Sequence, residues 1–514
     1  QATWDPYLSP SGWNGVTSVV MGNCGVGFAP AAPDRHEWLI ELMEGVEDIP
    51  GTALAEGIDW KWETFPEYLD ALDAMSRALD IGTQVPHGAV RAYVMGERGA
   101  RNEKPTAEEI HQMGEIVKEA IQAGALGFSS SRTIVHRSKD GEVVPGTYAT
   151  EDEIQGLGRA LGEAGAGVFE VASDLAPEHV SPGNPLSERN ELRWMRELSA
   201  KTGRPVSFAC LQNPIDPQQW RRLLDFCEED AGLGGSVTPQ VAPRPAGLLM
   251  GLQSSLHPFI THPAYQEIAE LPLAERVAAM KRPEVRERIL SQQPSAEMPI
   301  ALLILSSFHN LFAFGDPPDY EPAPESSVAA RAQREGRRPE EVAYDLLLER
   351  DGSELLYFPF LGYAEQNFDA LREMMMHPRA VFSLSDGGAH CGLICDASNP
   401  TFLLTHWVRD RTRGEKLPLE HVVRAQTRNT AALYGLHDRG QLRPGYKADL
   451  NVIDFDGLTI HRPEMVFDLP GGARRLIQKV NGYDATICSG VVTYEHDEAT
   501  GAMPGRLIRG PQKA

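Results

Sequence analysis

Two residues at the ends of predicted strands are the strongest candidates for chemistry. Residues 15–30 read GVTSVVMGNCGVGFAP, so that a β-branched run stops at Cys24 between glycines. A second apolar run, 380–385, ends directly before Asp386. A strand-end thiolate can bind zinc at ~2.3 Å, and a carboxylate there can bind a metal or take a proton from metal-bound water. The alternatives are a small buried thiol for Cys24 and a loop cap for Asp386.

Five further polar residues follow predicted strands: His390, His87, Arg91, Ser306 and Ser307. His390 stands four residues after Asp386 and is either a metal ligand or an ordinary loop histidine. His87 and Arg91 are candidates to hold a substrate carboxylate, with a satisfied polar cluster as the alternative. The two serines lack a surrounding G-x-S-x-G motif, which argues against a serine hydrolase. Weaker candidates are the loop residues Tyr93, Arg132, His136 and Tyr148.

An alternation of apolar strands and amphipathic helices would position these candidate residues. Predicted strands cover 16–21, 81–90, 126–130, 167–172, 205–210, 301–307 and 380–385. Predicted helices cover 63–79, 106–123, 151–164, 186–202 and 218–229. So many β and α units favour a parallel sheet closed into an α/β barrel, with its chemistry at the carboxyl ends of the strands.

The pattern changes in two places. Residues of about 290–350 carry Asp-Pro-Pro-Asp and Glu-Pro-Ala-Pro-Glu, which indicates an insertion near the barrel mouth. After Asp449 the pattern becomes β-like. We therefore expect a barrel domain over 1–440 and part of a small β-sandwich over 441–514.

The composition narrows the function classes. The 514 residues carry a formal net charge of −24, which disfavours nucleic acid and anionic membranes as partners. The six cysteines form no CxxC pair, which is typical of reduced thiols in a cytoplasmic protein. No apolar run approaches the ~18 residues of a membrane span, and no signal peptide is evident.

Four segments together resemble the amidohydrolase superfamily, within it the N-acyl-D-amino-acid deacylase (D-aminoacylase) group. They are GVTSVVMGNCGVGFAP at 15–30, GALGFSS at 124–130, SDGG at 385–388 and LRPGYKADL at 442–450. The resemblance implies a (β/α)8 barrel beside a β-sandwich, and hydrolysis of an amide by water activated by one or two Zn²⁺ or another divalent metal. By that resemblance Cys24 is a metal ligand, Asp386 is the general base and then acid, and Ser306 and Ser307 contact the substrate. Family members often self-associate, which would make the protein a homo-oligomer.

The sequence departs from that family in three ways. The His-x-His metal motif of barrel strand one would lie just before Gln1, so that the first strand and these two ligands are expected to be missing from this chain. The strand-five histidine is absent from residues 167–174. In strand six, Cys210 replaces a histidine and Gln212 replaces a substrate-binding lysine. The candidate metal ligands in this chain are thus Cys24 and Asp386, with Cys210, Glu170 or His390 as further candidates.

Three functions remain open at this point. The leading hypothesis is a metal-dependent hydrolase that cleaves an amide or related C–N bond of a small molecule. The second is a non-catalytic barrel that acts as a binding or partner subunit, because the family's histidines are missing. The third is a metal-free isomerase or lyase that uses Asp386 and His390.

Overall fold

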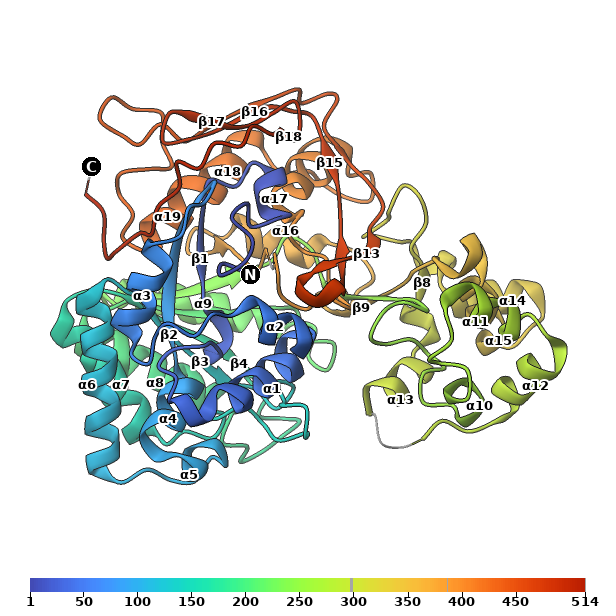
Figure 1. The fold of residues 1–514 in the computed structure, drawn as a ribbon, viewed down its shortest axis with the longest axis horizontal. Helices are drawn as coiled ribbons and strands as arrows, with labels where there is room; N and C mark the ends of the chain where they lie inside the picture. The colour runs from blue at the N-terminus through green and yellow to red at the C-terminus, as the bar shows by residue number, and fades with distance from the viewer. Residues whose placement is uncertain (296–298, 386, 514) are drawn as a thin grey trace.

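The protein is built around a seven-stranded parallel sheet (Figure 1). The computed structural model describes residues 1–295, 299–385 and 387–513. In spatial order the strands are β1 (Ser18–Met21), β2 (Asp80–Pro86), β3 (Gly127–Arg132), β4 (Val168–Ser173), β5 (Val206–Ala209), β6 (Val237–Val241) and β10 (Val381–Phe382). Every neighbouring pair is parallel, so all carboxyl ends lie at one edge of the sheet.

This order agrees with the predicted barrel as far as the sheet extends. Sequential strands are neighbours throughout, as in a (β/α)8 barrel. Within the described ranges, β1 and β10 form the two edges and do not pair with each other. Closure by an eighth strand therefore stays a prediction.

The central strands are buried on both faces, whereas β1 at the edge of the sheet is half-buried. All residues of β2 and β3 are buried, including the polar sequence Ser-Ser-Ser-Arg of β3. Successive side chains of a strand point to opposite faces. Phe128 and Ser130 accordingly face the helices, where both contact His87, the first residue of the helix after β2. Ser129 lies on the opposite face and contacts the turn after β1.

The helices associated with this sheet follow the expected alternation. They are α1 (His36–Glu47), α2 (Gly51–Gly57), α3 (Phe65–Asp73), α4 (His87–Met95), α5 (Glu97–Ala100), α6 (Ala107–Ala123), α7 (Glu151–Ala164), α8 (Glu188–Thr202), α9 (Gln219–Gly232), α16 (Asp369–Met376), α17 (Asn399–Phe402), α18 (Leu419–Arg424) and α19 (Thr430–Leu433). The start of α6 confirms the sequence interpretation, because Thr106 caps it and exchanges hydrogen bonds with Glu109 in a capping box.

The structure corrects three strand predictions. The strand predicted over 81–90 ends at Pro86, and α4 begins at His87. The run 301–307 lies in and just after a helix, α13 (Pro299–Leu305), rather than in a strand, since Leu and Ala favour helix and a short apolar run has no decisive period. Strand β6 was not predicted, because Pro239 inside it is unusual for a strand.

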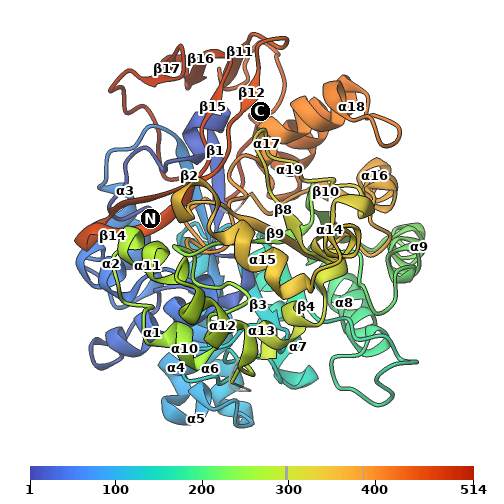
Figure 2. The same cartoon turned by 90° about the vertical axis from the view of Figure 1, so that its right-hand side faces the viewer.

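Residues of about 246–361 form a second lobe with its own apolar core, which extends from Met250 to Phe358. Its antiparallel sheet has the order β7 (Ala246–Met250), β9 (Leu356–Leu361) and β8 (Phe312–Ala313). Its other helices are α10 (Pro263–Gln266), α11 (Leu273–Met280), α12 (Pro283–Ser291), α14 (Val328–Glu335) and α15 (Pro339–Leu347). The lobe stands to the right in Figure 1, with α13 on the side toward the main sheet, and comes to the front in Figure 2.

The C-terminal part is antiparallel β-structure, in agreement with its β-like sequence pattern, and its arrangement as a sandwich domain over 441–514 stays a prediction. One sheet has the order β11 (Leu450–Ile453), β16 (Tyr483–Cys488), β17 (Val491–Glu495) and β18 (Glu498–Ala499). Two ribbons pair β12 (Thr459–Ile460) with β15 (Val480–Asn481) and β13 (Glu464–Leu469) with β14 (Ala473–Ile477). Across the described residues, no helix has the length and apolar character needed to cross a membrane.

Candidate active site at the carboxyl edge

The turn after β1 has a backbone shape that few residues accept. Gly22 and Gly25 have φ of 93° and 68°, and Cys24 between them has φ of 63° and ψ of 13°. A Cβ on Gly25 would lie 2.6 Å from the amide nitrogen of Ser131, so only glycine fits there. A non-glycine residue in the left-handed region carries conformational strain, and such strain is often found at functional positions.

Two neighbouring strands hold this turn through buried side chains. The Cys24 N–H donates to Glu170 Oε2 at 3.1 Å, and the Gly25 N–H donates to Ser129 Oγ at 3.1 Å. The Ser129 hydroxyl in turn donates to the Gly22 carbonyl. Ser129 on β3 and Glu170 on β4 are register partners, which places them side by side. We call Cys24, Ser129 and Glu170 the carboxyl-edge cluster.

Polar side chains continue on both sides of this cluster. Gln84 on β2 donates to Asn23 Oδ1 at 2.7 Å. Toward the other edge of the sheet, Gln240 on β6 donates to Ser207 Oγ at 2.9 Å and accepts from Ser383 Oγ at 2.5 Å. Glutamate, serine and glutamine side chains thus extend across the sheet, where a purely structural core would be apolar.

Two histidines lie beside the carboxyl-edge cluster. His136 Nδ1 is 2.9 Å from Ser131 Oγ, and His390 Nε2 is 3.3 Å from Glu47 Oε2 on α1. Burial, with a smaller effect of nearby His390, lowers the pKa of His136 to about 4. His136 is therefore neutral at pH 7, the form that binds metals or accepts protons.

The predicted catalytic residue Asp386 lies outside the described residues, but the segments on either side of it are anchored. The Leu384 carbonyl accepts from Asn399 Nδ2 at 2.6 Å. Asp396 Oδ1 accepts from Arg244 Nε at 3.0 Å, and the Arg244 guanidinium stacks 4.1 Å from the Tyr320 ring centroid. Arg244, which follows β6, thus connects the loop after β10 to the lobe.

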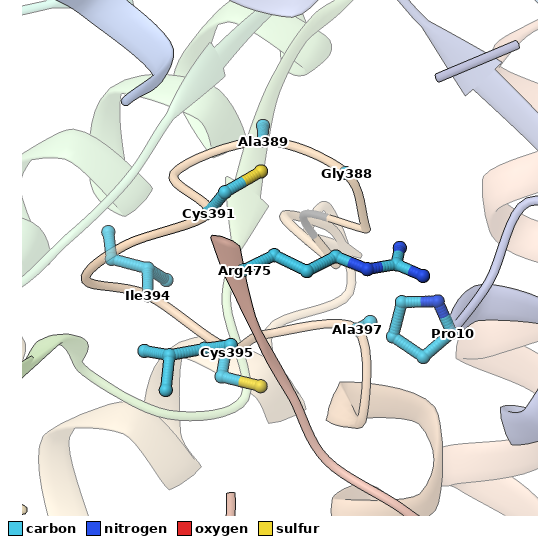
Figure 3. Close-up of a pocket in the computed structure, with 9 residues that line it drawn as sticks. Pro10, Gly388, Ala389, Cys391, Ile394, Cys395, Ala397 and Arg475 are labelled. Carbon is cyan, nitrogen blue, oxygen red and sulfur yellow. The ribbon is translucent and has the colours of Figure 1, made fainter. Parts of the chain in front are cut away.

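A small pocket lies beside that loop, lined in part by Cys391, Cys395 and Arg475 (Figure 3). Burial raises the pKa of both thiols to about 12, so both are protonated at neutral pH. Arg475 is held by Asp468 in two 2.8 Å contacts and donates to the Ser9 carbonyl at 2.7 Å. These groups pack the loop and supply no reactive thiolate.

His87 and Arg91 lie in a separate, fully buried group behind the sheet, in accordance with the structural alternative. His87 Nε2 is 3.0 Å from Glu153 Oε1 on α7, and Arg91 Nη1 donates to the same oxygen. His87 Nδ1 is 2.8 Å from Ser130 Oγ. We call His87, Arg91, Ser130 and Glu153 the His87 cluster. Their predicted substrate contact is not tested, and the structure does not bring them to Cys24.

The remaining predicted residues are also dispersed. The Cys210 sulfur is fully buried, 4.0 Å from Met374 Sδ on α16, and burial raises the pKa of its thiol to about 12. Ser306 and Ser307 follow α13 in the lobe, instead of a barrel strand. Gln212 is buried and accepts from the Ala364 N–H at 3.0 Å. Their proposed roles stay predictions.

In the part of the chain that the structure describes, no group of three or more His, Cys, Asp or Glu side chains is placed to hold a metal ion. The cluster supplies two such donors, Cys24 and Glu170. Sequence reasoning had named Glu170 only as an alternative ligand and had missed Ser129 and Glu47. For Ser129 the signal was present in GALGFSS, because alternation along the strand sends alternate serines to opposite faces.

The parallel sheet and its helices define an α/β protein with polar groups at the carboxyl edge of the sheet. Comparison with known families identifies it further: residues 1–494 match the model described as "Amidohydrolase family". The chain therefore belongs to the amidohydrolase family and is D-aminoacylase-like.

Curated relatives agree with this assignment over nearly the whole chain. The sequence is 26% identical to a D-aminoacylase of Alcaligenes xylosoxydans xylosoxydans, with 98% of this chain and 82% of the relative covered. It is 29% identical to an N-acyl-D-aspartate deacylase of the same organism, with 98% and 81% covered. These relatives support a hydrolase.

Solved structures share the fold. The crystal structure of a D-aminoacylase matches with a TM-score of 0.58 at 21% identity, covering 98% of this chain and 84% of that one. An N-acyl-D-glutamate deacylase from Bordetella bronchiseptica, complexed with zinc and a phosphonate inhibitor, matches with a TM-score of 0.58 at 20% identity, covering 98% and 85%.

Proposed function

We propose that this protein is a metal-dependent hydrolase that cleaves the amide bond, or a related C–N bond, of a small N-acylated molecule such as an N-acyl amino acid. The observation that carries the proposal is the hydrogen bond from the Cys24 backbone N–H to the buried Glu170 carboxylate at the carboxyl edge. The fold is that of deacylases, and in this fold the carboxyl edge of the sheet is where catalysis takes place.

The donors at this edge suit a divalent metal. A thiol and a carboxylate are both zinc ligands, and zinc in catalytic sites takes three protein ligands and leaves one position open. We assign Cys24 and Glu170 to the metal, with Asp386 as a third candidate. When bound, one or two Zn²⁺ or another divalent ion would activate a water molecule and polarise an amide carbonyl.

The protein residues have separate tasks in this proposal. Asp386 accepts the proton of the attacking water and then passes it to the leaving amine. Ser129 holds the turn that carries Cys24, because its hydroxyl accepts from Gly25 and donates to Gly22. His136 is held neutral by burial, and it is available to orient the substrate through a hydrogen bond.

The test combines metal content with activity. We expect about one or two zinc ions per chain and hydrolysis of N-acetyl-D-amino acids, with the L-isomers assayed in parallel. Cys24→Ser and Asp386→Asn should abolish turnover, and Cys24→Ser should also lose metal. The control is Cys227→Ser, a buried thiol on α9, which should keep both.

A non-catalytic barrel is the second candidate, favoured by the burial of Gln212 without a charge where the family places a lysine. Full-length protein that purifies without metal and hydrolyses none of these amides would favour this candidate. Activity of Asp386→Asn at the wild-type rate would contradict the proposed role of Asp386.

A further inference from the structure

Four exposed apolar side chains stand on three successive loops beside the carboxyl edge. They follow β3, β4 and β5, and the fractions of their surfaces that are exposed run from 45% to 65%: Ile134, Val135, Val180 and Ile215. Single exposed apolar residues are ordinary. Other exposed apolar residues occur elsewhere in the chain, but these four stand on three loops that follow successive strands of the main sheet. We call these four residues the apolar rim.

Hydrogen bonds and an ion pair join the three loops into one surface. The Ile134 N–H donates to Asp174 Oδ2 at 3.1 Å, which joins the loops after β3 and β4. His179 Nδ1 lies 3.8 Å from Asp216 Oδ2, which joins the loops after β4 and β5. Val180 and Ile215 are the chain neighbours of that pair. These contacts join the three loops that carry the rim.

The rim is also continuous with the candidate active site. Val135 directly precedes His136, whose ring contacts Ser131 at the end of β3. Ser131 in turn packs against Gly25 of the Cys24 turn. On the lobe, α13 lies on the side that faces the main sheet (Figure 1) and exposes Leu302 and Leu303, at 38% and 42%.

We propose that the apolar rim binds a medium- or long-chain acyl group, so that the substrate is an N-acyl compound with an aliphatic chain longer than acetyl. This inference rests on the proposed function. A small molecule fits better than a protein, because four side chains fall far short of the ~800 Å² per partner of a stable interface. The net charge of −24 disfavours an anionic lipid surface.

The test compares two substrates that differ only in acyl length, N-acetyl and N-octanoyl derivatives of the same amino acid, below the micelle concentration. Each buried methylene contributes roughly a fourfold gain in affinity. If the rim covers four of the six added methylenes, kcat/KM should be at least about 100-fold higher for the octanoyl substrate. A wild-type ratio below about threefold would overturn the inference.

Variants locate the effect. Val135→Asp and Ile215→Asp should lower the octanoyl-to-acetyl ratio at least about tenfold, because a carboxylate cannot be buried against an aliphatic chain without cost. Leu442→Asp is the control, since Leu442 is 82% exposed on a different loop, and it should leave the ratio unchanged. An equal fall of the ratio in all three variants would overturn the inference.

A binding measurement separates this inference from the proposed function. Calorimetry with octanoate needs no turnover, so it remains informative even if no amide is hydrolysed. Octanoate should bind the wild type at least about tenfold more tightly than it binds Ile215→Asp. Equal binding of acetate and octanoate would overturn the inference, as would adsorption to phosphatidylcholine vesicles that depends on the rim while the chain-length ratio stays flat.

Discussion

Ser129 and Ser130 are adjacent in β3, yet they belong to two very different polar groups. Ser129 joins the carboxyl-edge cluster, and Ser130 joins the His87 cluster. Each group contains a glutamate that is almost fully buried, Glu170 at 1% and Glu153 at 0% exposed. Burial of a carboxylate therefore does not by itself mark a functional site.

The two groups differ in what surrounds the carboxylate. Glu153 meets the side chains of His87 and Arg91, and the whole His87 cluster is closed to solvent. Glu170 accepts a hydrogen bond from the backbone of Cys24, a residue in the left-handed region whose side chain is partly open to solvent. Strained backbone and partial access favour chemistry at the first group, and the buried ion pair of Glu153 with Arg91 favours a structural role for the second.

The strongest test of this contrast is Glu170→Gln. We expect kcat/KM to fall by at least about 10³-fold, because a neutral amide cannot replace a carboxylate as ligand or proton acceptor. The midpoint of chemical unfolding should change little, since the amide has nearly the same shape. Steady-state kinetics and denaturant titration on the same preparation provide both values, and intact activity would place Glu170 outside the site.

Glu153→Gln should show the reverse pattern. The free energy of unfolding should fall by about 3–5 kcal/mol, because the buried Arg91 charge loses its partner. Turnover per folded molecule should stay within about twofold of wild type, as expected for a surrounding group that touches no substrate. Loss of activity without loss of stability would contradict the division into a functional and a structural group.

The pH dependence of stability sharpens the assignment of the His87 cluster. Burial lowers the pKa of His87, so that the folded state holds it neutral where the unfolded chain is protonated. Stability should therefore decrease as the pH falls below about 6.5, by roughly 1.4 kcal/mol per pH unit for one proton. His87→Gln should reduce this slope by the contribution of one proton and leave that of His136, whose pKa burial also lowers, whereas His111→Gln, at an exposed position, should leave the slope unchanged.

Glu153 extends the same effect to lower pH. Burial raises its pKa, but His87 and Arg91 outweigh that effect, and the net pKa lies below the ordinary glutamate value. Its contribution to stability is thus present above about pH 4.5 and is lost as the pH falls through the lowered value. Unfolding curves measured from pH 7 to well below pH 4.5 test both steps.

The smallest expected effect is the loss of a helix cap, which shows how much unfolding free energy an ordinary structural contact contributes. Thr106→Ala removes the N-cap of α6 and should cost about 1 kcal/mol of unfolding free energy. Activity and metal content should not change, because α6 lies on the outer layer. A loss of activity comparable to that of Glu170→Gln would mean that activity reports general stability rather than the site.

Much of the sheet could be predicted from the sequence. The apolar runs that precede Cys24 and Asp386 contain β1 and β10, and α6 and α7 begin within a residue of the predicted starts. These elements have clear periods and end signals. Residues 301–307 and β6 could not be predicted, because the first run has no decisive period and the second contains Pro239.

The candidate site was less predictable. Cys24 was identified from its place at a strand end, but its partner Glu170 is 146 residues away in the chain. His87 and Arg91 also follow a strand, yet α4 turns both toward Glu153 on α7. The position of a residue after a strand does not tell which of the two faces of the sheet its side chain will lie on.

The sequence by itself determined the family, the cysteine at the end of the first described strand and those elements that have a clear period, because strand periods, caps and glycine-bounded turns are local properties. Only the tertiary structure decided which buried glutamate meets Cys24 and which neutralises Arg91. That choice depends on the register between β3 and β4, where Ser129 and Glu170 stand side by side and Ser130 turns to the opposite face.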